Sequence, residues 1–194
     1  MATESLVSVI EAAARCLEGV GFKYALVGEA AMPAWGRIRA TQDADIFLYV
    51  DPSELGLDAA LTSLVGAMRS AGFAHLEVAD RCSLGDKQVL FFWFPFRPEG
   101  FSLRVDVLVS DRPLYSEIVE RAVLKKIDGQ RVPIASCEDL ILMKLGAGRA
   151  VDIADARELA AINKSSIDQA YLRSRATAWG LSREIQEILD SIRD

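Results

Sequence analysis

The segment TQDADIFLYV, residues 41–50, constrains the fold more than any other part of this chain. From Ile46 onward it is continuously apolar, and a short apolar run closed by an Asp-Pro pair predicts a buried β-strand. Asp43 and Asp45 stand at the start of this strand. Because side chains at positions i and i+2 of a strand point to the same face, we expect the two carboxylates to lie side by side. Their repulsion next to an apolar core requires a compensating positive charge.

A third acid occupies the middle of another apolar run. The segment LRVDVLVS places Asp106 inside an expected strand, where aspartate is rare and is seldom buried without a partner. If the two strands are neighbours, Asp43, Asp45 and Asp106 converge. Oxygen ligands of this kind suit Mg²⁺ bound together with substrate phosphates. Two such ions can hold the attacking and leaving oxygens of a phosphoryl transfer.

A structural alternative explains the same acids without any ligand. In this interpretation Asp43 is a turn residue, and Asp106 pairs with Arg104 across an edge strand. Asp45 would then pair with Arg37 or Arg39 of the preceding loop. The two loop arginines are equally suited to neutralise a triphosphate, or to lie on the surface.

A glycine corner lies upstream of the acids, in KYALVGEAAMPAWG. An apolar strand ends there at Gly28, and a short helix follows. Glycine allows a ligand to approach the backbone closely, and the N–H groups at a helix start attract anions. This corner is therefore a candidate phosphate-binding element, although a glycine after a strand is common.

The remaining pattern indicates a mixed α/β (α+β) protein. Helices are expected over residues 3–19, 29–36, 53–71 and 111–123, and strands over 23–28, 73–79, 87–96 and 101–109, followed by a hairpin around 128–129. From Ser136 onward every segment has helical spacing, and Asp139 three residues later resembles a capping box. The sequence thus predicts an α/β core over residues 1–135, followed by a helical region over residues 136–194 that packs on it.

Composition excludes several classes of protein. The net charge of −6 argues against a protein that wraps long nucleic acid, since such proteins usually carry a basic excess. The three cysteines are odd in number and widely spaced, which predicts a reduced, cytoplasmic setting. The first residues lack the pattern of a signal peptide, and no apolar run is long enough to cross a membrane.

Together these motifs resemble the signature of the DNA polymerase beta-like nucleotidyltransferase superfamily. Gly28-Glu29, thirteen further residues and Asp-Ala-Asp-Ile match its first part, and Asp106 supplies the later strand acid. Within the superfamily the chain is similar to small bacterial nucleotidyltransferases that include the AbiEii-type toxins. These share two patterns, matched here by Arg39, Thr41, Asp43 and Asp45 and by Asp139, Leu140, Lys144, Arg149, Asp152 and Asp155. The similarity covers roughly residues 20–160.

The resemblance implies a mixed-sheet nucleotidyltransferase core and a magnesium-dependent enzyme. It would transfer a nucleoside monophosphate from a nucleoside triphosphate to a hydroxyl on a small molecule, a protein or an RNA end, and release pyrophosphate. By resemblance, two Mg²⁺ ions are held by Asp43, Asp45 and Asp106, and the last acid also helps to activate the acceptor hydroxyl. Nucleotide binding is implied for Gly28, Glu29, Arg37, Arg39, Thr41 and Lys144.

One position departs from the family pattern. Where the superfamily has Gly or Ser, this chain has Glu29, whose carboxylate cannot donate a hydrogen bond to a phosphate. Glu29 could turn away, pair with Arg37 or Arg39, or join the metal site. An alternative function is therefore a weak or inactive nucleotidyltransferase that acts as a binding partner, for example in a toxin–antitoxin pair. The presence of all three acids favours the enzyme.

Overall fold

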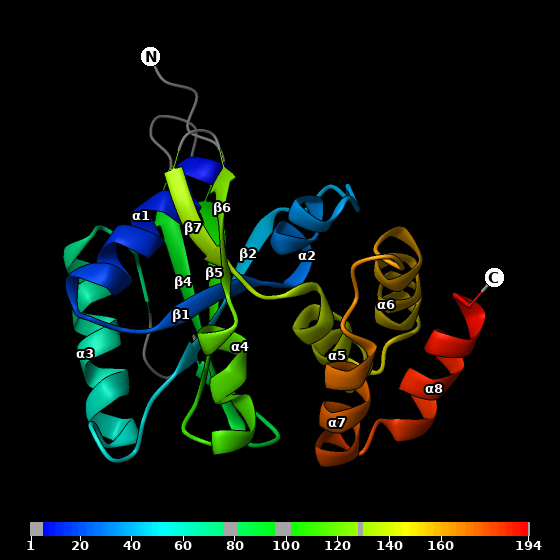
Figure 1. Ribbon diagram of the computed structural model, residues 1–194. Helices are drawn as coiled ribbons and strands as arrows, with labels where there is room; N and C mark the ends of the chain where they lie inside the picture. Colours follow the sequence, from blue (N-terminus) through cyan, green and yellow to red (C-terminus); the bar gives the residue numbers. More distant parts are fainter. Residues whose placement is uncertain (1–5, 76–80, 96–101, 128–129, 194) are drawn as a thin grey trace.

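The computed structural model describes residues 6–75, 81–95, 102–127 and 130–193. These residues contain one seven-stranded mixed sheet with the strand order β3-β4-β5-β2-β1-β7-β6 (Figure 1). The strands are β1 Tyr24–Val27, β2 Asp43–Tyr49, β3 Arg81–Leu84, β4 Lys87–Pro95, β5 Ser102–Ser110, β6 Val123–Ile127 and β7 Gln130–Ile134. The helices are α1 Leu6–Gly19, α2 Gly28–Ala31, α3 Leu57–Ser70, α4 Ser116–Glu120, α5 Cys137–Ala147, α6 Ala150–Ile162, α7 Gln169–Trp179 and α8 Ser182–Ser191, with 3₁₀ turns η1 Met32–Trp35 and η2 Pro113–Tyr115.

The centre of the sheet is the pairing between β2 and β5. These strands run parallel and place Asp45 opposite Asp106. On its other side β2 pairs with β1 in the antiparallel sense, with Val27 opposite Asp45. The expectation that the acid-bearing strands are neighbours is therefore confirmed, and the glycine corner after β1 lies next to them.

Helices cover both faces of this sheet. On one face α1 and α3 contact each other, and α1 reaches β2, β5 and β7. The opposite face carries α4, which contacts β1 and β2 (Figure 1). On β2 the ring of Phe47 meets Tyr115 of η2 at 5.9 Å between centroids. Because side chains alternate along a strand, Asp43 and Asp45 lie on the same face as Phe47.

The described residues after β7 are helical, as expected. Ser136 is the N-cap of helix α5: its hydroxyl accepts a hydrogen bond from the Asp139 N–H at 3.1 Å, so the expected cap is confirmed. The helical region is joined to the core through η1. The Trp35 indole donates to the Ala135 carbonyl at 3.0 Å, and the Asn163 amide donates to the Trp35 carbonyl at 2.9 Å. A boundary between two domains at residue 135 stays a prediction.

Three local expectations differ from the structure. Strand β3 was not anticipated, because its sequence RCSL lacks apolar alternation; it pairs with β4 around Gly85, whose φ is +62°. The expected helix 111–123 is helical only from Pro113 to Glu120, and Val123 begins β6. Helix α3 starts four residues late, because the Asp51 carboxylate accepts from the Ser53 N–H at 2.8 Å in a turn.

The expected strand 73–79 lies largely outside the described residues; within them Ala74 forms an isolated bridge with Trp93. In the described part of the chain, none of the helices combines the length and the apolar character that crossing a membrane requires.

Candidate functional site

The three predicted acids come together on the face of the sheet that bears α4. Asp43 opens β2, Asp45 follows two residues later, and Asp106 stands opposite Asp45 on β5. Asp106 is buried, whereas Asp43 and Asp45 are partly exposed. Their proximity raises the question of how the negative charge is balanced.

Asp45 carries the most unfavourable charge. Burial, followed by repulsion from Asp106 and Asp43, raises the pKa of Asp45 to about 7, despite an opposing effect of Lys144. Within the described residues, no hydrogen bond or ion pair reaches its carboxylate. The side chain is pressed against the glycine corner: a Cβ atom added to Gly28 would lie 2.0 Å from the Asp45 Oδ2 atom. Gly28 also has φ +63°, so both conformation and space require glycine here.

Asp43 and Asp106 share one cation, Arg104. Its Nη2 atom donates to Asp43 Oδ2 at 2.8 Å, and its Nε atom forms an ion pair with Asp106 Oδ1 at 2.7 Å. The Thr41 hydroxyl donates to the other Asp43 oxygen at 2.8 Å. Burial nevertheless outweighs Arg104 and raises the pKa of Asp106 to about 6. The ligand-free interpretation of the sequence was thus right that Asp106 pairs with Arg104, but wrong that this happens on an edge strand, because β5 lies between β4 and β2.

The donor set suits a hard divalent ion, although the carboxylates are not arranged around one. Asp106 Oδ1 is buried without an aligned hydrogen-bond donor among the described residues. An orphaned carboxylate oxygen beside two further acids is the kind of ligand that Mg²⁺ takes. In the part of the chain that the structure describes, however, three or more acidic, histidine or cysteine side chains are nowhere grouped to hold a metal. The three carboxylates are chemically suited to bind Mg²⁺, and two of them, Asp43 and Asp106, are paired with Arg104.

A second ionic cluster ties α5 to α6. Lys144 is buried, and its ammonium group donates to Asp152 at 3.1 Å and to Asp155 at 3.0 Å, both of which are fully buried. Burial acts to raise the pKa of Asp152 and of Asp155. Hydrogen bonds outweigh the effect of burial, from Arg149 and Lys144 to Asp152 and from Lys144 and Arg37 to Asp155, so the pKa of each carboxyl stays below its ordinary value. Lys144 thus lies among carboxylates, and its implied reach toward a triphosphate stays a prediction.

The loop arginines join this cluster instead of the strand acids. Arg37 contacts Asp155 at 2.6 Å and also pairs with Glu158. Arg39 bridges Asp155 at 3.2 Å and Glu29 at 2.8 Å. Of the three arrangements considered for Glu29, the structure has the ion pair with Arg39, which neutralises its carboxylate. The alternative that Asp45 pairs with either arginine is wrong.

A cleft of about 700 Å³ opens between the sheet and the helical region. At one end it is lined by Gly28, Glu29, Asp45 and Lys144, four of the predicted site residues. Arg149 joins them from the start of α6; it is bonded to Asp152, and its side chain is 69% exposed. Helix α5 adds an apolar wall that includes Leu140 and Met143.

The far end of the cleft is aromatic and was not anticipated. Tyr115 and Trp179 meet edge to face at 5.1 Å between ring centroids. Lys87 lies over the Tyr115 ring at 4.0 Å and donates to its hydroxyl at 2.8 Å. Nothing in the sequence around these three residues marks them. Arg149, by contrast, belongs to the second sequence pattern that the family resemblance matched, so the sequence did indicate this residue.

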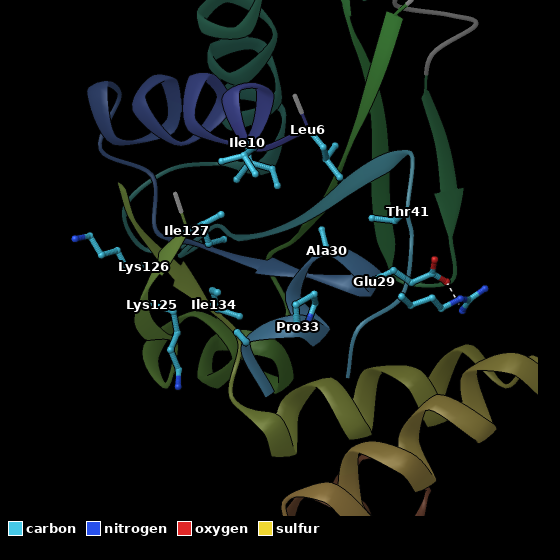
Figure 2. A pocket seen from close by; sticks show the side chains of 13 residues that line it. Leu6, Ile10, Glu29, Ala30, Pro33, Thr41, Lys125, Lys126, Ile127 and Ile134 are labelled. Atoms are coloured by element: carbon cyan, nitrogen blue, oxygen red, sulfur yellow. Dashed lines mark hydrogen bonds and ion pairs between the residues drawn. The ribbon is translucent and has the colours of Figure 1, made fainter. Parts of the chain in front are cut away.

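A second pocket of about 660 Å³ lies on the other side of Glu29. Figure 2 shows its apolar lining, to which Ile10 of α1, Ile127 and Ile134 contribute, with Glu29 at its edge. Arg39, the ion-pair partner of Glu29, also lines this pocket. Thr41 also lines it, so the predicted nucleotide-binding residues are divided between the two pockets. None of the three strand acids lines this second pocket, whereas Asp45 lines the cleft.

Comparison with models of protein families gave no match, and comparison with curated sequences gave none either. Solved structures do match. A candidate nucleotidyltransferase from Helicobacter pylori shares 19% identity over 96% of this chain and 94% of its own, with a TM-score of 0.50. A candidate nucleotidyltransferase from Thermotoga maritima shares 15% identity over 78% of this chain and 90% of its own, with a TM-score of 0.49. The antibiotic-resistance factor ANT(2″)-Ia shares 14% identity over 96% of this chain and 90% of its own, with a TM-score of 0.47. The likeness to the Helicobacter pylori structure, at a TM-score of 0.50, shows the fold alone: the chain has a nucleotidyltransferase fold, as the resemblance implied. The AbiEii-like subgroup stays a prediction.

Proposed function

We propose that this protein is a magnesium-dependent nucleotidyltransferase that uses the cleft beside Asp45. One observation carries the proposal: Asp45 and Asp106 lie in register on adjacent parallel strands, and Asp45 touches the Gly28 corner at the mouth of the cleft. Carboxylates beside a backbone corner of this kind suit a metal-bound triphosphate. A cleft of about 700 Å³ also falls in the size range of small-molecule and cofactor sites.

The three acids divide into two roles in the proposed reaction. Asp43 and Asp45 would hold the ions that accompany the triphosphate, and Asp106 would bind the catalytic ion and orient the acceptor hydroxyl. The bound ions would neutralise the phosphates and the charge that develops on the leaving pyrophosphate. The protein itself positions the groups, because phosphoryl transfer depends mainly on alignment and charge stabilisation.

The cations of the cleft divide the remaining work. Arg149 is exposed, and its pKa is raised mainly by the hydrogen bond to Asp152, with further contributions from the charges of Glu29 and Asp45. It is therefore suited to contact a triphosphate at the Gly28 corner. Lys144 is committed to Asp152 and Asp155, and we assign it to holding α5 and α6 in place behind that corner. Because Arg39 pairs with Glu29, the carboxylate at this family position does not present an uncompensated charge to the phosphates.

The test is to incubate the protein with Mg²⁺, each α-³²P-labelled nucleoside triphosphate in turn, and a cell extract, and to find what becomes labelled. We expect a labelled small molecule, protein or RNA with one triphosphate, and no label with the double variant Asp43→Asn, Asp45→Asn. The control is Asp58→Asn, an exposed acid on α3. Label that persists in the double variant, or that never forms with wild type, would contradict transfer by this site.

The alternative function, an inactive binding partner on the same fold, is favoured by one observation: Arg104 already occupies Asp43 and Asp106. It predicts that nucleoside triphosphates bind in the cleft without transfer. Equilibrium binding of a fluorescent ATP or GTP analogue with Mg²⁺, measured beside the labelling assay, separates the two functions. A toxin–antitoxin context, an RNA or protein acceptor, and a cytoplasmic location stay predictions.

A further inference from the structure

We propose that Arg104 is a built-in counter-ion of the acid site, which a divalent ion must displace, so that this arginine lowers the affinity of the site for metal. The inference rests on the proposed function, because it concerns the same carboxylates. It adds a residue that the sequence pattern of the acids does not include. In this view the metal-free protein is held in a self-neutralised state.

Arg104 contacts one carboxylate oxygen on each of two acids that are predicted to bind metal. Asp43 Oδ2 receives the Nη2 hydrogen bond at 2.8 Å, while Thr41 occupies Oδ1 of the same carboxylate. Asp106 Oδ1 lies 2.7 Å from Arg104 Nε. An ion that bound Asp43 and Asp106 on the Arg104 side would have to take these same oxygens, so the guanidinium and the ion compete.

The Asp106 contact is the weaker of the two. Both Arg104 Nε and Asp106 Oδ1 are buried without an aligned hydrogen-bond partner in the described part of the chain, although they are close enough for an ion pair. An ion pair without an aligned hydrogen bond lacks the directional part of a charge-assisted hydrogen bond. A divalent ion supplies twice the charge of the guanidinium, and it would also serve Asp45, which Arg104 does not contact.

The surroundings of Arg104 offer its side chain an alternative position away from the carboxylates. Its side chain is 37% exposed, so displacement does not require the core to open. The guanidinium carbon lies 5.5 Å from the Phe91 ring centroid and 5.9 Å from that of Trp93. These residues of β4 pair in register with Asp106 and Arg104, so their rings lie on the same face of the sheet. Arg104 can therefore leave the carboxylates and keep a cation–π contact.

A purely structural role for Arg104 makes the opposite prediction. If the arginine only holds the acids in place, removing it lets the carboxylates separate and weakens metal binding. If it competes with the ion, removing it strengthens metal binding. The direction of the change in affinity decides between the two.

The experiment measures Mn²⁺ binding by isothermal titration calorimetry or electron paramagnetic resonance at fixed ionic strength, without nucleotide. The variants are Arg104→Gln, Asp45→Asn and, as a control of equal charge change, Arg183→Gln, whose side chain is 87% exposed on α8. We expect Arg104→Gln to bind Mn²⁺ roughly five- to thirtyfold more tightly than wild type, since the ion pairs of Arg104 with Asp43 and Asp106 no longer have to be broken. Arg183→Gln should bind as wild type does, and Asp45→Asn more weakly.

The outcomes separate this inference from the proposed function. Saturable binding that Asp45→Asn weakens but that Arg104→Gln leaves unchanged or weaker would overturn the inference and leave the metal site intact. If neither wild type nor Arg104→Gln binds Mn²⁺, the metal-dependent function fails as well. Binding that is detectable only in Arg104→Gln would support the inference strongly.

A measurement on wild type covers the case in which Arg104→Gln does not fold. The ¹⁵N–¹H resonance of Arg104 Nε, assigned in the metal-free protein, should shift as Mg²⁺ is added and saturate together with the amide resonances of Asp45. An Nε resonance that stays in place while the Asp45 amide shifts would refute displacement.

Discussion

Replacing Asp45 by asparagine should stabilise the metal-free protein at neutral and alkaline pH but not at acidic pH. Because the folded pKa of Asp45 is raised above its ordinary value, the group favours folding while it is protonated. That contribution is fully present below about pH 3.8 and is lost as the pH rises through about 7. Asparagine carries no charge at any of these values, so the variant escapes the loss.

The size of the effect follows from the shift. The pKa of Asp45 rises from 3.8 to about 7, and about three units at about 1.4 kcal/mol each give about 4 kcal/mol. The free energy of unfolding of Asp45→Asn, relative to wild type, should therefore rise by about 4 kcal/mol between pH 4 and pH 8. This figure already contains the repulsion between Asp45 and Asp106, so the relief of Asp106 in the variant is not added to it.

The assay is urea denaturation in the presence of EDTA, followed by tryptophan fluorescence at several pH values from 4 to 8.5. The chain has three tryptophans to report unfolding. Taking the difference between variant and wild type removes the titration of the other groups, and Asp58→Asn, on the exposed surface of α3, should give a flat line. A difference for Asp45→Asn that is independent of pH, or that falls as the pH rises, would refute the argument from burial and repulsion.

Two further substitutions probe the neighbouring structure by the same denaturation assay. Gly28→Ala should cost several kcal/mol, because it combines an unfavourable positive φ, worth about 1–2 kcal/mol, with a Cβ atom 2.0 Å from Asp45 Oδ2. Gly21→Ala, at φ +77° with open space around it, should show the backbone cost alone. Equal losses at the two positions would disprove the close approach. Asp155→Asn should cost about 3–5 kcal/mol at pH 7, because Arg37 loses its buried partner and Lys144 loses one of its two buried partners, Asp152 being the other. Asp190→Asn, which removes an exposed partner of Arg193, should cost less than about 1 kcal/mol. A small loss at Asp155 would show that the cluster is not needed for stability.

The sequence predicted the acids well because strand periodicity and topology act on them together. The i, i+2 spacing of Asp43 and Asp45 fixed their common face, and Asp106 could join them only from a neighbouring strand. The position of Gly28 after β1 was equally readable, since few residues other than glycine tolerate its conformation. These are short-range rules that a single chain expresses directly.

The partners of the charged residues could not be predicted in the same way. Arg37 and Arg39 stand only a few residues before the acids, yet both reach Asp155, more than a hundred residues further along the chain. Whether an arginine turns toward one carboxylate or another depends on how the helical region docks, which local spacing does not encode. The same holds for Tyr115, Lys87 and Trp179, which three separate segments bring to one end of the cleft.

The pairing of β2 with β5 also has a consequence for how the chain folds. Residues about 60 positions apart, such as Asp45 and Asp106, must meet, and β1 pairs with a strand still more distant, with Leu26 opposite Ile134. Contacts between segments so far apart carry a large loop-closure cost and form slowly compared with hairpins such as β6–β7. The pair Asp45–Asp106 is among these long-range contacts, and the repulsion between the two carboxylates does not favour its early formation. Metal binding should therefore appear only in the late steps of refolding, which makes it a kinetic marker for completion of the central sheet.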